Sequence, residues 1–126
     1  MHAGEGWPPA EIREAVEHLH AQRIGHGKTL PDDPAVLDLV RERGVTVEVC
    51  LTSNLHTGAI DELAAHPLPR LLEAGVRVTV CTDNTLFSGV DEPGEYRRAA
   101  ALPGMRADAV EALAAFGHAA AFPRRR

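Results

Sequence analysis

Two short segments constrain the fold of this chain more than any other feature of its sequence. In Val45–Cys50, and again in Val76–Thr82, valine alternates with a more polar residue. This period of two is typical of a β-strand that packs one face against a hydrophobic core. Apolar residues at helical spacing precede and separate the two segments. Strands that alternate with helices predict a parallel sheet in an α/β fold.

Proline, acidic residues and glycine mark where the other elements are expected to begin and end. No linker or repeat divides the sequence, so residues 1–126 are interpreted as one domain, a partial one as argued below. The predicted helices run from Pro8 to about Ala21, from Asp32 to Gly44, from Leu68 to Ala74 and from Arg106 to Phe116; a short strand covers Arg23–Gly27, and loops cover Leu51–Gly58 and Asp83–Gly94.

The alternation also separates two kinds of parallel sheet. A strand inside an open doubly wound sheet is apolar on both faces. A barrel strand packs one face outward on helices, while some inward residues reach a site at the carboxyl end. The polar partners of the valines therefore favour a barrel. They also place Asp83 on the inward face together with Thr79 and Cys81.

Composition and charge exclude several function classes. Hydrophobic residues make up 44% of the 126 residues and charged residues 25%, which is ordinary for a globular domain. A net charge of −5 gives no basic surface for nucleic acid or an anionic membrane, and the basic run at Arg124–Arg126 is expected to be a solvated end. No apolar run is long enough to span a bilayer or act as a signal, so a cytoplasmic location is expected. Cys50 and Cys81 lack a CxxC pattern and are predicted to be buried free thiols.

Four polar clusters stand at the predicted strand ends or directly after them. A parallel barrel would bring all of them to one rim. Histidine and aspartate are zinc ligands, and a glutamate beside a metal can act as general acid or base. The residues alone leave two interpretations open, a metal-dependent hydrolase site or a set of capping and turn residues. The clusters are His2 to Glu5, His26, Thr52 to Asn54, and Asp83 with Asn84.

Four segments, in this order, resemble signature sequences of the adenosine deaminase family. They are His2-Ala3-Gly4-Glu5, Arg23-Ile24-Gly25-His26-Gly27, Glu48-Val49-Cys50-Leu51-Thr52-Ser53-Asn54 and Thr82-Asp83-Asn84. The resemblance covers about residues 2 to 98. It implies that the chain is the C-terminal half of a (β/α)8 TIM barrel, about strands 5 to 8, and that the barrel is incomplete as given. It also implies one zinc ion at the carboxyl-terminal rim.

The same resemblance implies a reaction and a role for each matched residue. A zinc-activated water would deaminate adenosine or deoxyadenosine hydrolytically to inosine and ammonia, so the partner is a small-molecule purine nucleoside. His2 and Asp83 match zinc ligands. Glu5 matches the acid that protonates purine N1, and His26 the residue that orients and assists the water.

Gly4 and Asn84 are the residues to which the resemblance assigns substrate binding. Asn84 stands where many family members have a second aspartate that contacts purine N7. An amide donates a hydrogen bond there without needing an added proton, so asparagine is compatible with purine binding.

The chain departs from the family because it lacks the His-x-His pair that supplies two further zinc ligands. His18-Leu19-His20 does not replace that pair, because it falls in a predicted helix where residues two apart point about 200° away from each other. The other histidines, His56, His66 and His118, are expected on the surface, in loops or at a helix start. We expect weak or no zinc binding and no measurable deaminase activity from this chain alone.

A half barrel would leave strand edges open and valines facing water or another chain, which predicts self-association. Three hypotheses about the function stay open: an adenosine deaminase whose start is assigned too late, an inactive remnant, and a deaminase of another 6-aminopurine such as aminodeoxyfutalosine. Leu51 and the Asp83-Asn84 pair favour adenosine.

Overall fold

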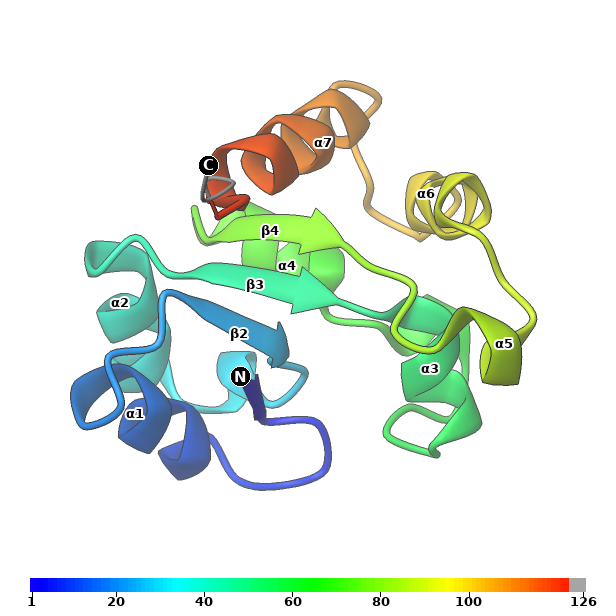
Figure 1. Cartoon of the computed structure of the whole chain (residues 1–126). Coiled ribbons are helices and arrows are strands. Elements are labelled where there is room, and N and C mark those ends of the chain that lie inside the picture. The colour runs from blue at the N-terminus through cyan, green and yellow to red at the C-terminus, as the bar shows by residue number, and fades with distance from the viewer. Residues whose placement is uncertain (123–126) are drawn as a thin grey trace.

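The computed structural model describes residues 1–122, which form one parallel sheet flanked by helices (Figure 1). Its strands are β1 (His2–Ala3), β2 (Arg23–His26), β3 (Thr46–Val49) and β4 (Arg77–Val80). They lie in chain order, and each pairs with the next in parallel. Parallel neighbours need a crossover connection, and at least one helix joins each pair. The predicted α/β class with a parallel sheet is therefore confirmed.

The helices begin close to where proline and acidic residues predicted them. Asp33, for example, caps α2 by accepting hydrogen bonds from the N–H groups of Ala35 and Val36. The helices are α1 (Ala10–Glu17), α2 (Pro34–Glu42), α3 (Leu51–His56), α4 (Leu68–Glu73), α5 (Thr85–Ser88), α6 (Glu92–Ala100) and α7 (Ala109–Ala120), with 3-10 turns η1 (Leu30–Asp32) and η2 (Leu63–Ala65).

The valines of β3 and β4 lie inside the hydrophobic core. Val47 and Val78 are fully buried, in one cluster with apolar residues of α1, α2 and α4. Burial of each such side chain contributes about 1.5–3 kcal/mol. The expectation that these valines would face water or another chain was wrong, because helices of the same chain cover them. The covering residues include Ile12, Val16, Val36, Val40, Leu68 and Leu71.

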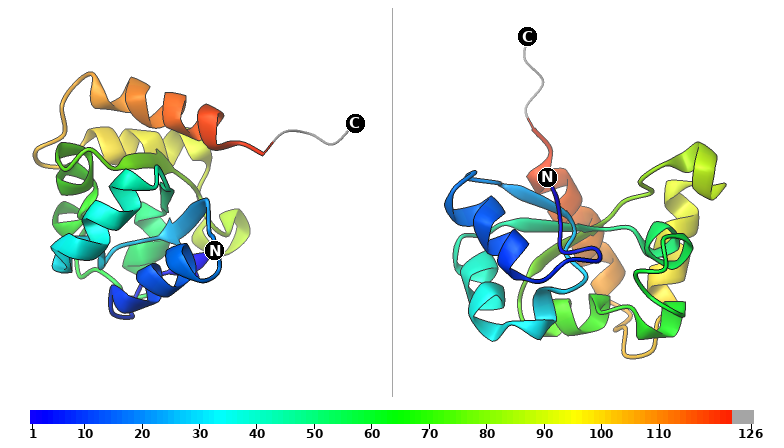
Figure 2. Two further views of the ribbon diagram at one scale, coloured as in Figure 1. Left: turned by 90° about the vertical axis from the view of Figure 1, so that its left-hand side faces the viewer. Right: turned by 90° about the horizontal axis from the view of Figure 1, so that it is seen from below.

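Helix α7 covers the opposite face of β4. Thr79 alternates with the valines and is buried, and a Cβ added to Gly117 of α7 would lie 2.5 Å from its Oγ1. At the end of α7, Arg23 Nη1 donates to the Ala120 carbonyl at 3.3 Å, and its guanidinium lies 4.1 Å from the Phe122 ring centroid. Part of the face expected to look inward in a barrel is thus occupied by α7, which lies beside β4 in Figure 1 and on the opposite side of the molecule from α1 and α2 in the left view of Figure 2.

Two predicted loops are wrong. Leu51–Gly58 contains α3, and Asp83–Gly94 contains α5 and the start of α6. Glu95 of α6 accepts hydrogen bonds from the Thr52 N–H, at 3.0 Å, and from its hydroxyl. This contact between distant parts of the chain holds the first turn of α3, and no local pattern reveals it.

Smaller differences concern helix ends and cysteines. Helix α1 ends at Glu17 rather than near Ala21, and α7 continues to Ala120. Both cysteines are free thiols as predicted, although only Cys50 is buried and Cys81 is partly exposed. Burial raises the pKa of both, that of Cys81 to about 11.

Within residues 1–122, no helix has the length and apolar character needed to cross a membrane. The basic run at 124–126 lies outside the described residues.

Candidate functional site

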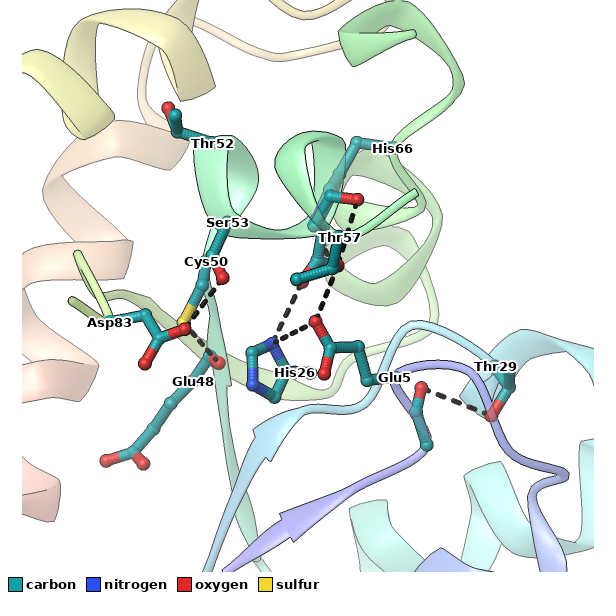
Figure 3. Close-up of polar contacts among 12 residues, drawn as sticks. Glu5, His26, Thr29, Glu48, Cys50, Thr52, Ser53, Thr57, His66 and Asp83 are labelled. Carbon is teal, nitrogen blue, oxygen red and sulfur yellow. Dashed lines mark hydrogen bonds and ion pairs between the residues drawn. The ribbon is translucent and has the colours of Figure 1, made fainter. Parts of the chain in front are cut away.

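The site lies where the parallel strands end. His26 closes β2, and Asp83 follows β4. Both adopt left-handed backbone conformations, with φ of 71° and 57°, which residues other than glycine rarely take. Such strain persists where the surrounding structure enforces it, and it is frequent at functional sites. Figure 3 shows both side chains directed into the space in front of the strand ends.

Glu5 and His26, the two predicted catalytic residues, lie close together. The shortest approach is 3.7 Å, between Glu5 Oε1 and His26 Nδ1. Thr57 Oγ1 donates to the same carboxylate oxygen at 2.8 Å. His26 is buried, whereas the Glu5 side chain is 31% exposed. The carboxyl group is therefore fixed at one oxygen and accessible to a ligand.

Behind His26 lies a buried polar contact that the sequence did not reveal. Asn54 is fully buried, and its Oδ1 lies 2.9 Å from His26 Nδ1. Its Nδ2 lies 3.4 Å from Nε2 of His66. In the sequence, Asn54 belongs to a polar triplet that follows a valine strand, and this position was the available signal of a role in the site. Its partners could not be predicted, because they come from other segments of the chain.

His66 was predicted to be a helix-start residue, and the structure confirms this. Its Nδ1 accepts the Leu68 N–H at 3.1 Å, at the start of α4. Burial lowers the pKa of His66 to about 4. The remaining histidines outside the site, His18, His20, His56 and His118, are exposed as expected.

The predicted metal ligands lie at the same rim, but in the open. His2 and Asp83 are both exposed, and the His2 ring lies 5.0 Å from that of His26. Ser53 Oγ donates to Asp83 Oδ2 at 2.7 Å. Across residues 1–122, no group of three or more histidine, cysteine or acidic side chains could hold a metal. A catalytic zinc usually takes three protein ligands, so the donor set of this part of the chain is incomplete.

Gly4 has a structural role that is independent of substrate. Its φ is 68°, and an added Cβ would lie 2.5 Å from Ile12 Cδ1. Its N–H donates to Glu11 Oε2 at 3.1 Å. A side chain at this position would clash, so glycine is required whether or not Gly4 contacts a ligand.

Asn84 caps the short helix α5. Its Oδ1 accepts the Phe87 N–H at 2.9 Å, and its side chain is exposed at the rim. The amide oxygen is therefore engaged, which leaves Nδ2 to donate elsewhere. Substrate binding by Gly4 and Asn84 stays a prediction.

Successive βα units with titratable side chains at the carboxyl ends of their strands are the arrangement found in enzymes built on (β/α) barrels. A family model described as adenosine deaminase matches residues 1–125. The chain therefore belongs to the adenosine deaminase family.

Individual proteins show how much of a relative the chain represents. It is 44% identical to adenosine deaminase of Escherichia coli (strain SE11) over 105 residues, which are 83% of this chain and 32% of that protein. It spans about a third of the length of the curated relatives it matches.

Solved structures show the same relation. Adenine deaminase from Arthrobacter aurescens superposes with a TM-score of 0.90 at 32% identity, covering 98% of this chain and 38% of that one. An amidohydrolase from Burkholderia ambifaria with bound Zn gives a TM-score of 0.86, over 98% of this chain and 35% of its own; at 24% identity it shows the fold alone.

Proposed function

We propose that this chain supplies the proton-transfer side of a site that deaminates a 6-aminopurine nucleoside hydrolytically, converting adenosine or deoxyadenosine to the inosine product and ammonia. The observation that carries the proposal is the contact of Glu5 with His26 at the strand ends, 3.7 Å apart. The proposal concerns the complete site, since the chain spans about a third of its curated relatives.

Glu5 is the proton donor to purine N1 in this proposal. Attack of water at C6 removes ring aromaticity and makes N1 basic, so an acid is needed beside N1. Glu5 must carry its proton when substrate binds. Thr57 donates to Oε1 at 2.8 Å, which leaves Oε2 to hold and deliver the proton. The same hydrogen bond then stabilises the carboxylate that remains.

His26 and Asp83 act on the attacking water. The His26 Nδ1 contact with Asn54 fixes the ring, and in Figure 3 the second ring nitrogen lies on the side toward Asp83. The Asp83 carboxylate, oriented by Ser53 at 2.7 Å, can accept a proton from the water. Both residues have a left-handed backbone conformation, and Figure 3 shows their side chains directed into the same space.

Zinc would lower the pKa of a bound water to about 7. His2 and Asp83 have the right donor atoms, but residues 1–122 hold no third ligand for them. Within the described residues, the ligand set therefore does not complete a zinc site. The expectation of weak or absent zinc binding by this chain alone stands as a prediction.

The substrate is proposed to be a purine with a 6-amino group. Relatives named adenosine deaminase and adenine deaminase share this feature. Asn84 Nδ2 can donate to N7, because only its oxygen is used in capping α5. The second candidate is deamination of another 6-aminopurine. That the chain is an inactive remnant of such an enzyme is a further proposal. We also propose a cytoplasmic location, no nucleic-acid or membrane partner, and self-association of the chain. A measurement of its molecular mass in solution would test the self-association.

A chimera tests the proposed function directly. The 105 residues that align with the Escherichia coli enzyme would replace the matched segment of that enzyme. Conversion of adenosine to inosine would be followed by absorbance. We expect turnover, lowered about 10²–10⁴-fold by Glu5→Gln. The chain alone, supplied with zinc, should give no measurable turnover. A folded, zinc-loaded chimera inactive on adenosine but active on another 6-aminopurine would select the second candidate, and one inactive on every 6-aminopurine would refute the proposal.

A further inference from the structure

A buried path of hydrogen-bonding groups leads from the site into the core. It begins at His26, passes through Asn54 to His66, and ends at the backbone N–H of Leu68. Each of the three side chains is at most 4% exposed, so water does not take over their hydrogen bonds. Every hydrogen-bond donor and acceptor along the path must therefore be paired with a neighbouring group of the protein.

The Leu68 N–H fixes one end of this path, because a backbone amide can only donate. It donates to His66 Nδ1 at 3.1 Å, so Nδ1 carries no proton. A neutral imidazole has its single proton on the other nitrogen, Nε2. Burial keeps His66 neutral at pH 7, since its pKa is lowered to about 4. Nε2–H of His66 is thus a donor directed at Asn54.

Asn54 can satisfy this donor only with its amide oxygen. The structure places Nδ2 3.4 Å from His66 Nε2 and Oδ1 2.9 Å from His26 Nδ1. The longer nitrogen–nitrogen distance is what two opposed donors would give. A half-turn of the amide exchanges oxygen and nitrogen at nearly the same positions. It would bring the oxygen to His66 and the NH₂ group to His26 Nδ1.

We infer that His66 is a positioning residue that acts through the Asn54 amide to hold the proton of His26 on Nε2, the nitrogen toward Asp83. With the amide oxygen bound to His66, the NH₂ group donates to His26 Nδ1, which must accept. Glu5 Oε1, 3.7 Å from the same Nδ1, favours the opposite tautomer with a proton on Nδ1. The buried path selects the tautomer with the proton on Nε2. The other tautomer would place two donors, His26 Nδ1–H and the Asn54 NH₂ group, against each other where no water can accept a hydrogen bond from either.

The consequence for catalysis rests on the proposed function. A His26 that is protonated on Nε2 donates a hydrogen bond to the attacking oxygen and does not remove its proton. That proton then goes to the carboxylate of Asp83, which Ser53 orients. The Nε2–H tautomer therefore makes His26 the hydrogen-bond donor to the attacking oxygen and Asp83 the acceptor of its proton.

Nuclear magnetic resonance of the whole chain, labelled with ¹⁵N-histidine and measured at pH 7, tests the inference. Correlations between ring nitrogens and carbon-bound ring protons identify which nitrogen is protonated. We expect the proton on Nε2 in both His66 and His26. A His26 proton on Nδ1 in the unmodified chain would overturn the inference. The measurement needs no turnover, so it can succeed where the deaminase assay of the chimera fails.

Substitution of His66 tests the direction of control. His66→Leu removes the donor that holds the Asn54 oxygen, so the amide can turn toward His26 and the proton should move to Nδ1, beside Glu5. His56→Gln, which removes an exposed histidine from α3, is the control and should leave the His26 signals unchanged. A folded His66→Leu chain with an unchanged His26 tautomer would contradict the inference.

A conservative variant covers the case in which His66→Leu does not fold. In Asn54→Asp, a carboxylate of nearly the same shape accepts from both rings. The His26 proton should then lie on Nδ1, while His66 keeps Nε2–H. If His26 stays protonated on Nε2 alone, Asn54 does not control its tautomer and the inference fails.

Discussion

The site has two halves of different construction. The buried half, consisting of His26, Asn54 and His66, is at most 4% exposed and linked by side-chain contacts. The exposed half, consisting of His2, Asp83 and Asn84, faces solvent at the strand ends. Packing inside the chain therefore orients the buried half, whereas backbone geometry and single hydrogen bonds position the exposed half, which contains the two candidate metal ligands His2 and Asp83. Fixed side-chain orientation is thus a property of the buried half, and the candidate metal ligands belong to the exposed half.

The largest effect expected from this comparison is on stability. Asn54→Leu keeps the volume but leaves the His66 Nε2–H and a His26 nitrogen without partners in the core. We expect a loss of about 3 kcal/mol in unfolding free energy, measured by urea denaturation. Asp83→Asn, a change of similar size in the exposed half, should cost less than about 0.5 kcal/mol. Similar losses in both variants would remove the distinction between the halves.

The buried half should also make the fold sensitive to acid. Burial lowers the pKa of His66 to about 4 from 6.5, so the unfolded chain binds a proton more readily than the folded chain. Stability is therefore lost as pH falls from about 6.5 toward 4. We expect about 2 kcal/mol between pH 7 and pH 5 from this group.

A paired measurement isolates the contribution of His66. His66→Gln should show a shallower decline of unfolding free energy over the same pH range, while His118→Gln, a change at an exposed histidine, should keep the original slope. Parallel curves for all three proteins would mean that His66 is protonated equally in the folded and unfolded chains.

The smallest effect concerns the hydrogen bond that orients Asp83. Ser53→Ala removes the 2.7 Å contact to Oδ2, but water can replace it because Asp83 is exposed. We expect the free energy of unfolding to fall by about 0.5 kcal/mol. The turnover of the active chimera should fall by a larger factor than this free energy corresponds to. A stability loss comparable to that of Asn54→Leu would show that the exposed half is tied to the core as well.

The sequence predicted what depends on local pattern. Valine alternation located β3 and β4, and the position of polar residues at strand ends brought Glu5, His26 and Asp83 to one rim. It did not reveal α3, because Glu95 holds that helix from a distant segment. The partnership of Asn54 with His66 escaped for the same reason. Contacts of this kind depend on tertiary packing, which periodicity and motif spacing do not encode.

The placement of α7 has a consequence for the order in which the molecule assembles. The hydrogen bond from Arg23 to the Ala120 carbonyl joins residues 97 positions apart, and Gly117 of α7 packs closely against Thr79 of β4. Closing so long a loop is entropically costly until the sheet exists. We expect α7 to dock last during folding and to be released first in the native state. Amide hydrogens of α7 should accordingly exchange with deuterium sooner than those of β3.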